Sequence, residues 1–542
     1  MVFISLAESS QEEHIIKVAD FIKKNKAIII RACVLGLLPL FLCVLYCTFH
    51  AKTIFDVYLP GSEWNDELFY FKQVEAIVKY GFPQGYFGFN ESHAQVLSFA
   101  AWSPVLVFPW IIWGKLFGWG LMSPILCNIF LLTLAVVLFV LLVKPNLKQS
   151  IMLGVGICSF YPFIRYMLSG MPEVICFSMA IIFYGLVYSY NGIPKKWKLI
   201  ALFMMASVMT LMRPYLILFL LIPIYFCVKD YKVNGIIISV VVAGVTAVGY
   251  ALIKKFLGAE YFADLFFTDW ITTFIHEGFG AGVRNLVTKL YYMGSDFKRH
   301  TILGIKEGLC SGAIFASYLV VMCIMAVQTI IDVIGYFRNK EAKEEIKKTL
   351  LIEVHFVVSL VSMLFALLLM YKLTEGSKHL LLFLSLSIFV VGLLRTKVYE
   401  KLVILCATFI FFFIIKGTDP YDYAVPFKDI HTVEMVGRWQ GVYNKNLVLS
   451  EADVPNFDNV VIWTFYDGID GVNTNSTWQY LYKLPEGFGI SCCMPAYVKD
   501  NMDDLKSKYI MTPAGGTIDI NMEEKGYTLI FRDEELALYM TR

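Results

Sequence analysis

The sequence has little charge. Only 17% of its 542 residues are Asp, Glu, Lys or Arg, whereas 58% are hydrophobic. A chain with so few charges does not have the surface of a soluble globular protein. Many of its apolar runs are about 16–23 residues long, the length that crosses a bilayer. The composition therefore excludes a soluble domain and indicates a polytopic α-helical membrane protein.

Two further absences narrow the function. The formal net charge is only +2, and the basic residues stand in short clusters between apolar runs, where they orient a membrane protein. We therefore expect no nucleic-acid partner. The sequence also lacks an internal repeat and the inverted symmetry that is typical of secondary transporters. Cys492 and Cys493 are adjacent, an awkward geometry for a disulfide.

The N-terminal half of the chain predicts its own orientation. Residues 1–26 place lysines opposite apolar residues at helical spacing, the pattern of a helix on the cytoplasmic membrane surface. These lysines precede the first span, residues 27–49, so the positive-inside rule puts the loop 50–120 outside. Residues 102–118 contain two prolines, and a crossing there would put the later basic clusters outside. We interpret residues 102–118 as an outer-leaflet helix that does not cross.

With that assignment the remaining apolar runs alternate across the membrane. Residues 27–416 form a transmembrane module of about eleven spans, with a second large outer loop at 254–308. The predicted spans are 27–49, 121–143, 150–168, 174–190, 199–212, 214–228, 234–253, 309–331, 350–372, 379–395 and 401–416. The tail 417–542 has short strand patterns and one helical pattern, which predict a small extracytoplasmic α/β domain able to fold alone.

Two acidic residues open the helical pattern of the first outer loop. Asp66 and Glu67 follow the first span, and Glu173 follows Met171 and Pro172 at the next outer loop. A carboxylate facing a lipid-borne leaving group can act as a general base or hold a divalent cation against a phosphate. The alternative is that all three are first-turn acids that stabilise helix N-termini.

Together with the loop FPQGYFGFNESHA, the segment from Ala101 to Pro104, and Arg213 with Pro214, these acids resemble the GT-C superfamily of membrane glycosyltransferases. That superfamily includes protein O-mannosyltransferases and bacterial aminoarabinose transferases. The resemblance implies transfer of a sugar, with inversion, from a polyprenyl-phosphate donor to an envelope glycan, lipid or protein. It implies Asp66 as base, with Glu67 and Glu173 assisting or binding a divalent metal ion. It also implies a multi-pass protein of a bacterial plasma membrane, in contact with membrane lipids.

Several residues on the outer face are candidates to bind the donor. Cationic side chains can hold its phosphate and aromatic ones can stack on its sugar. These candidates are His93, Trp102, Arg213, Arg284, Lys378 and His379. Each can equally anchor the chain at the membrane interface. His93 with Glu91 makes half a metal site, so the metal ligands stay open.

Two other functions also stay open. A flippase or transporter of lipid-linked sugars needs polar residues buried along a path through the membrane. The candidates for such a path, Arg165, Glu353, His355 and Lys372, lie near predicted span ends. The second of these functions is that of a non-catalytic envelope-assembly protein, whose outer domain binds polymer and whose acids are structural.

Overall fold

The computed structural model describes residues 2–57, 66–82, 87–91, 103–258, 269–306, 310–338, 343–370, 373–393, 425–428, 430–450, 456–464 and 478–541. The described residues are mostly helical and include one small sheet. Its α-helices are α1 (Val2–Phe49), α2 (Asp66–Tyr80), α3 (Phe108–Phe117), α4 (Ser123–Val143), α5 (Leu147–Ser159), α6 (Tyr161–Met167), α7 (Glu173–Gly192), α8 (Lys196–Met212), α9 (Leu221–Leu257), α10 (Asp269–His276), α11 (Phe279–Lys306), α12 (Cys310–Arg338), α13 (Lys343–Met370), α14 (Leu373–Leu393), α16 (Ile430–Asn446), α17 (Trp478–Leu481), α18 (Pro495–Asp500) and α19 (Thr517–Glu524). Its strands are β1 (Phe87–Phe89), β2 (Val460–Thr464), β3 (Gly489–Cys493), β4 (Tyr509–Pro513), β5 (Thr528–Arg532) and β6 (Leu536–Met540).

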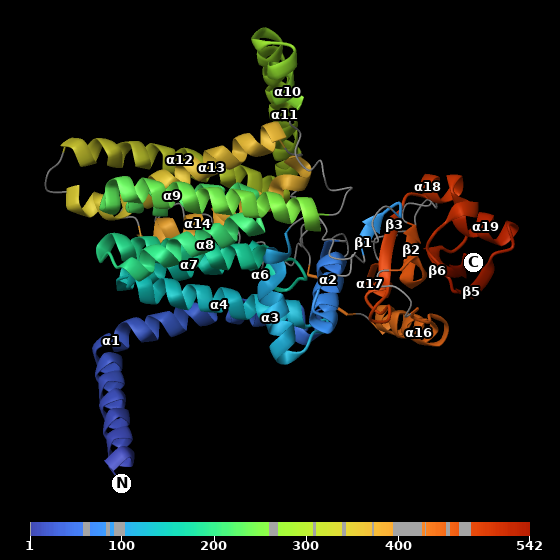
Figure 1. Ribbon diagram of the computed structural model, residues 1–542, viewed down its shortest axis with the longest axis horizontal. Helices are drawn as coiled ribbons and strands as arrows, with labels where there is room; N and C mark the ends of the chain where they lie inside the picture. The colour runs from blue at the N-terminus through green and yellow to red at the C-terminus, as the bar shows by residue number, and fades with distance from the viewer. Residues whose placement is uncertain are drawn as a thin grey trace.

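The long helices form a bundle, and the sheet lies beyond one end of it (Figure 1). We call this end the sheet-side end and the opposite one the far end. Helices α2 and α3 lie at the sheet-side end, between the bundle and the sheet. Within the bundle, α4 packs against α1 and α7, and α12 packs against α13.

Helix α4 illustrates why these segments are helices in a membrane. It has no charged residue and carries Pro124 in its first turn, where a missing N–H costs nothing. One side is buried in the bundle, while Leu126, Phe130 and Leu134 are exposed at intervals of four residues. A stripe of exposed apolar side chains with this spacing covers one helix face. Such a face on an otherwise apolar helix is suited to lipid and not to water.

Five of the described helices are long and apolar enough to cross a membrane, or six if the bent pair α5 and α6 counts as one span. They are Asn25–Phe49, Ser123–Val143, Glu173–Gly192, Pro214–Leu257 and Thr349–Met370. The chain is therefore an integral multi-pass membrane protein. The prediction of about eleven spans is not confirmed, and the predicted span 401–416 lies outside the described residues.

The 44-residue segment Pro214–Leu257 is a hairpin and not one straight helix. Straight, it would extend about 66 Å, roughly twice the hydrocarbon thickness of a bilayer. Lys232 has non-helical dihedral angles, φ 51° and ψ −120°. A Cβ on Gly235 would collide with the carbonyl group of Cys227, although a straight helix would place these residues about 12 Å apart. The chain therefore turns back at Lys232, between the predicted spans 214–228 and 234–253.

Contacts at the far end show how α1 and α4 run. Arg31, early in the apolar part of α1, donates a hydrogen bond of 2.8 Å to the carbonyl oxygen of Pro145, just after α4. The two helices are thus antiparallel, and α3 between them lies at the sheet-side end (Figure 1). The apolar helical stretch Pro104–Phe117 is shorter than a membrane span. A segment 102–118 that does not cross the membrane requires α1 and α4 to be antiparallel, with the segment between them at one end of the bundle, and both conditions are met.

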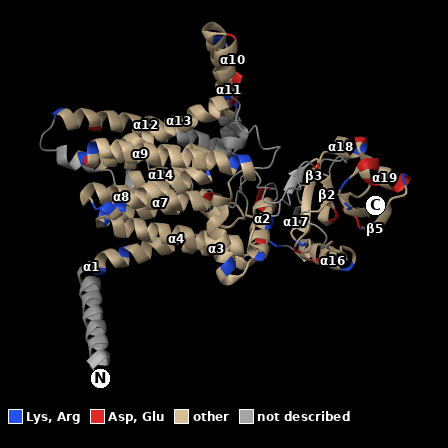
Figure 2. Cartoon of the chain, viewed as in Figure 1, with Lys and Arg blue, Asp and Glu red and all other residues tan. Residues whose placement is uncertain are grey.

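Lysine and arginine residues are found at the far ends of α8, α9 and α12 (Figure 2). At this end Lys198 donates hydrogen bonds to the carbonyl oxygens of Ser189 (2.8 Å) and Ile193 (2.9 Å). The positive-inside rule predicts that the far end faces the cytoplasm. The position of the sheet outside the cell follows from this rule and stays a prediction.

The sheet has the strand order β1-β3-β2-β4-β6-β5. Strands β1, β3, β2 and β4 are parallel, and β6 and β5 are antiparallel to their neighbours. Strands β2, β3 and β4 are buried along their whole length, as expected for parallel strands covered on both faces. Strand β1 belongs to the first outer loop, and its Phe87 lies opposite Ile490 of β3. The tail predicted as a separate α/β domain therefore shares its sheet with the first loop.

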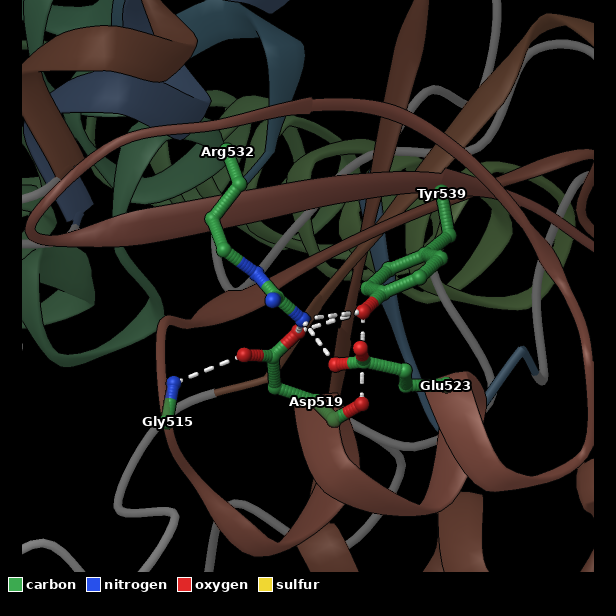
Figure 3. Close-up of polar contacts among 5 residues, drawn as sticks. All are labelled: Gly515, Asp519, Glu523, Arg532 and Tyr539. Atoms are coloured by element: carbon green, nitrogen blue, oxygen red, sulfur yellow. Dashed lines mark hydrogen bonds and ion pairs between the residues drawn. The ribbon is translucent and has the colours of Figure 1, made fainter.

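Asp519 fixes α19 to the antiparallel edge of the sheet (Figure 3). Its Oδ1 accepts hydrogen bonds from the Tyr539 hydroxyl (2.6 Å) and from Arg532 (2.7 Å), and its Oδ2 accepts one from the Gly515 N–H (2.7 Å). Arg532 also pairs with Glu523 at 2.8 Å. Burial raises the pKa of Tyr539 to about 12, so its hydroxyl stays a donor at neutral pH. These groups bind one another, and we assign the network to stability.

Candidate functional site

Helix α2 begins at Asp66, so both predicted acids lie in its first turn. Asp66 is partly buried, whereas Glu67 is fully buried. The Glu67 Oε1 accepts a hydrogen bond of 3.0 Å from the N–H of Gly170. Glu67 therefore ties the start of α2 to the turn that precedes α7. Asp66 is the more accessible carboxylate of the two.

The turn before α7 is held by Asn128, a buried residue near the start of α4. Its amide nitrogen lies 3.2–3.3 Å from the carbonyl oxygens of Tyr166, Ser169 and Met171. Its amide oxygen accepts a hydrogen bond of 3.0 Å from the indole of Trp110 on α3. Sequence reasoning missed Asn128. The available signal was an amide side chain in an apolar run, which in a membrane needs a polar partner.

Glu173 and Arg213 form a buried ion pair at this end of the bundle. The distance from Arg213 Nη2 to Glu173 Oε1 is 2.6 Å, and the side chains are only 2% and 1% exposed. Glu173 is the first residue of α7, and Arg213 directly follows α8, where Pro214 prevents α8 from continuing. Removing either partner would leave the other as an uncompensated buried charge.

His379 of α14 completes this cluster. Its Nδ1 lies 3.1 Å from Arg213 Nη1 and 3.1 Å from the hydroxyl of Tyr215. A guanidinium group can only donate hydrogen bonds, so the Nδ1 of His379 accepts, and a neutral ring carries its proton on Nε2. Arg213 also donates to the Tyr215 hydroxyl at 3.2 Å. We call Glu67, Glu173, Arg213, Tyr215 and His379 the outer cluster.

The outer cluster draws on four separate parts of the sequence: α2, α7, the corner between α8 and η3 (Pro214–Leu220), and α14. Tyr70 of α2 is close enough to Arg213 to interact with it electrostatically. Five predicted site residues are thus found in one region, namely Asp66, Glu67, Glu173, Arg213 and His379. Among the described site residues, Arg284 lies apart, exposed on α11, which projects from the bundle (Figure 1). His93, Trp102 and the side chain of Lys378 lie outside the described residues.

Glu91 does not have the environment of a metal ligand. It is buried against the C-terminal domain. Its Oε1 accepts hydrogen bonds from the N–H (2.7 Å) and hydroxyl (2.6 Å) of Ser507, and its Oε2 accepts from the Lys506 N–H and the Tyr497 hydroxyl, both at 3.2 Å. These four donors occupy the carboxylate. The predicted half-site of His93 and Glu91 is therefore not supported for Glu91, which joins the first loop to the domain.

The acids of the outer cluster also do not fit a divalent metal ion. Among the described residues, no group of three or more His, Cys, Asp or Glu side chains could hold one. Glu173 already has the guanidinium of Arg213 at 2.6 Å, and this positive charge would repel a metal cation at the same carboxylate. The chemistry proposed below therefore contains no step through a metal.

No protein-family model and no characterised protein sequence matches the chain. Among solved structures, ArnT from Cupriavidus metallidurans bound to undecaprenyl phosphate is 9% identical, with 94% of this chain and 97% of that chain covered and a TM-score of 0.42. The oligosaccharyltransferase AglB from Archaeoglobus fulgidus, in complex with an inhibitory peptide and a dolichol-phosphate, is 11% identical, with 94% and 73% covered and a TM-score of 0.47. The Archaeoglobus fulgidus oligosaccharyltransferase in complex with Zn and sulfate is 12% identical, with 95% and 73% covered and a TM-score of 0.47.

All three TM-scores are below 0.5, so the chemistry has to be argued from the residues of this chain.

Proposed function

We propose that the protein is a glycosyltransferase that moves a sugar from a polyprenyl-phosphate donor to an acceptor hydroxyl at the sheet-side end of the bundle. The observation that carries this proposal is the outer cluster, in which buried acidic and cationic groups from four segments meet beside the partly exposed Asp66. Charged side chains that are buried within a membrane protein are costly, and the sites that contain them are usually functional.

We assign the role of general base to Asp66. An acceptor hydroxyl has a pKa far above neutral, so its proton must leave as the new bond forms. Glu67 and Glu173 are both fully buried, whereas Asp66 is partly exposed at the start of α2, so Asp66 is the acid of the three that an acceptor can reach. Glu67 and Glu173 then act as positioning residues, which hold α2, α7 and Arg213 in place.

The reaction balances without a further reactant. The acceptor oxygen forms a bond to the anomeric carbon, its proton passes to Asp66, and the bond from the anomeric carbon to the phosphate oxygen breaks. The polyprenyl phosphate leaves with the bonding electrons. Attack from the face opposite to the leaving group inverts the configuration. Arg213 is the cation of the cluster, and its N–H groups are suited to hydrogen-bond phosphate oxygens.

The flippase alternative depends on polar residues inside the membrane. Glu353 and His355 of α13 are both buried. The ring nitrogens of His355 contact the Tyr184 hydroxyl (3.0 Å) and the Leu218 carbonyl oxygen (2.9 Å), so this side chain joins three helical segments. We assign His355 to packing. Glu353 is a buried acid of the kind that a path through the membrane needs, so we keep the flippase as the second candidate.

The two candidates give different results in proteoliposomes. The purified protein would be reconstituted with a radiolabelled polyprenyl-phosphate sugar and a mixture of envelope acceptors. Our proposal predicts label in the acceptor fraction and release of free polyprenyl phosphate. Movement of the intact donor between leaflets, with no label transferred, would support the flippase. If neither transfer nor movement is detected, the result would favour the non-catalytic assembly protein.

A further inference from the structure

Helices α10 and α11 form a hairpin that projects sideways from the bundle, near its sheet-side end (Figure 1). The chain turns at Gly278, whose φ of 87° suits glycine. Asn285 of α11 donates a hydrogen bond of 2.9 Å to the Thr273 hydroxyl of α10. The rings of Phe274 and Phe279 lie 5.9 Å apart. The hairpin is therefore a packed unit, which we call the arm.

An exposed apolar stripe runs along the arm. Phe279, Val283, Val287 and Tyr291 follow one another at intervals of four residues, which places them on one side of α11. They are 79%, 37%, 58% and 73% exposed, and Ile275 of α10 is 71% exposed. A contiguous stripe of large apolar side chains on a projecting element marks an interaction surface.

The charge of the arm is complementary to anionic lipid. Residues 269–306 contain five lysines and arginines, among them Arg284, Lys289, Lys298 and Arg299, against the three acids Asp269, Glu277 and Asp296. Arg284 directly follows Val283 of the stripe, and its side chain is exposed. Basic residues beside an apolar helix face are typical of helices that lie in a membrane interface.

The placement of the arm agrees with this composition. The bundle helices cross the membrane, and the arm runs across their direction near one end, so its axis follows the plane of the membrane (Figure 1). It extends away from the sheet and from α2 and α3. Helix α12, against which α11 packs, is also apolar and has exposed side chains at Val327 and Ile330, so the arm leaves the bundle beside a helix with a face suited to lipid.

We propose that the arm lies in the headgroup layer of the outer leaflet, with its apolar stripe against the acyl chains and its basic residues on anionic phospholipid headgroups. Arg284, predicted from the sequence to bind the donor, then contacts membrane lipid instead. Helix α11 also contacts α14, which carries His379, so a lipid-bound arm would support the helix that completes the outer cluster.

The test uses the full-length protein in nanodiscs of phosphatidylglycerol and phosphatidylcholine. An environment-sensitive fluorescent amino acid replaces Val287 of the stripe or, as a matched control, the adjacent exposed Thr288. The probe at 287 should be quenched by nitroxide on the acyl chains at least about twofold more than the probe at 288, and aqueous iodide should show the opposite order. The double variant Arg284→Gln/Lys298→Gln should weaken acyl-chain quenching at 287 in nanodiscs with phosphatidylglycerol and leave it unchanged in pure phosphatidylcholine.

Two results would overturn the proposal. Equal access of iodide to both probes, with no quenching by lipid, would show an arm in water. Protection of the probe at 287 from iodide without quenching by lipid would show that another part of the protein or a second copy covers the stripe. Variants that retain the thermal midpoint of the parent protein exclude misfolding as the cause of any difference.

Discussion

The carboxylate of Glu91 in the first outer loop accepts two hydrogen bonds from Ser507 in the C-terminal domain, one from its N–H at 2.7 Å and one from its hydroxyl at 2.6 Å. Asn90 and Glu91 both have positive φ, 50° and 54°, which is uncommon for residues other than glycine and costs backbone energy. The loop that contains Asp66 is thus joined to the domain near its middle. Lys72 of α2 adds a second link, a hydrogen bond of 3.1 Å to the carbonyl oxygen of Leu484.

We expect Glu91→Gln to loosen this connection. The amide would keep the shape but place N–H groups where the carboxylate now accepts from four donors. A buried donor without its acceptor costs about 1–3 kcal/mol. The thermal midpoint of the full-length protein should fall, and the segment around β1 should become sensitive to protease. The matched control is Glu486→Gln, because Glu486 forms an exposed pair with Lys79, and such pairs contribute about 0–1 kcal/mol. Equal midpoints for the two variants would count against the connection.

The isolated tail 417–542 should be less ordered at β3 than the same tail in the full chain. The sequence predicts that it folds alone, but the structure takes β1 from the first loop, so the isolated tail exposes the free edge of β3. Hydrogen exchange of the amides in residues 489–493 should be faster in the isolated tail. The amides of β6 serve as the internal control, because their partners β4 and β5 both belong to the tail. Unchanged exchange at β3 would show that β1 adds no stability.

The adjacent cysteines should be unreactive in the folded protein. Both are free and buried. Burial raises the pKa of Cys493 to about 12 and raises that of Cys492 well above its usual value. A raised pKa keeps a thiol protonated, so raising the pH from 7 to 9 should not produce the reactive thiolate. Mass spectrometry should find both unmodified by a thiol reagent at pH 9 and modified after denaturation. Modification of the folded protein that increases between pH 7 and 9 would contradict the burial.

The Glu173 and Arg213 pair should show strong coupling. Glu173→Gln or Arg213→Gln alone leaves one buried charge, which typically costs about 3–5 kcal/mol. The double variant removes both charges and should lose much less than the sum of the single losses. Thermal midpoints of the four proteins in one detergent would measure this. Additive losses would mean that the two side chains do not act on each other.

Part of this fold could be predicted from the sequence. The apolar runs predict α4, α7 and α8, and the boundary near Lys232 was expected between two spans. The predicted span 150–168 is instead divided into α5 and α6, which are bent relative to one another. The acids of the first loop were expected at a helix start, where α2 begins with Asp66. Local patterns carried these predictions, because helix periodicity and capping depend on neighbouring residues.

The rest depends on contacts between distant residues. Strand β1 has only three residues, and its partner β3 lies about 400 positions later, so no local pattern joins them. Glu91 was interpreted as a metal-ligand candidate because its donors, on Tyr497, Lys506 and Ser507, lie more than 400 positions later in the sequence. His379 was one of several outer cations, and only the packing of α14 brings it to Arg213.

The central claim is that Asp66 removes the proton of the acceptor. The most direct measurement compares initial rates of sugar transfer from a polyprenyl-phosphate donor for the parent protein, Asp66→Asn and Glu486→Gln in the same proteoliposomes. Glu486 is the control, because it is an exposed carboxylate that pairs with Lys79 near the end of α2. Loss of a general base typically lowers the rate by roughly 10²–10⁴-fold. We predict a loss of at least about 10²-fold for Asp66→Asn, with the parent rate for Glu486→Gln and equal thermal midpoints. Transfer by Asp66→Asn at the parent rate would contradict the claim.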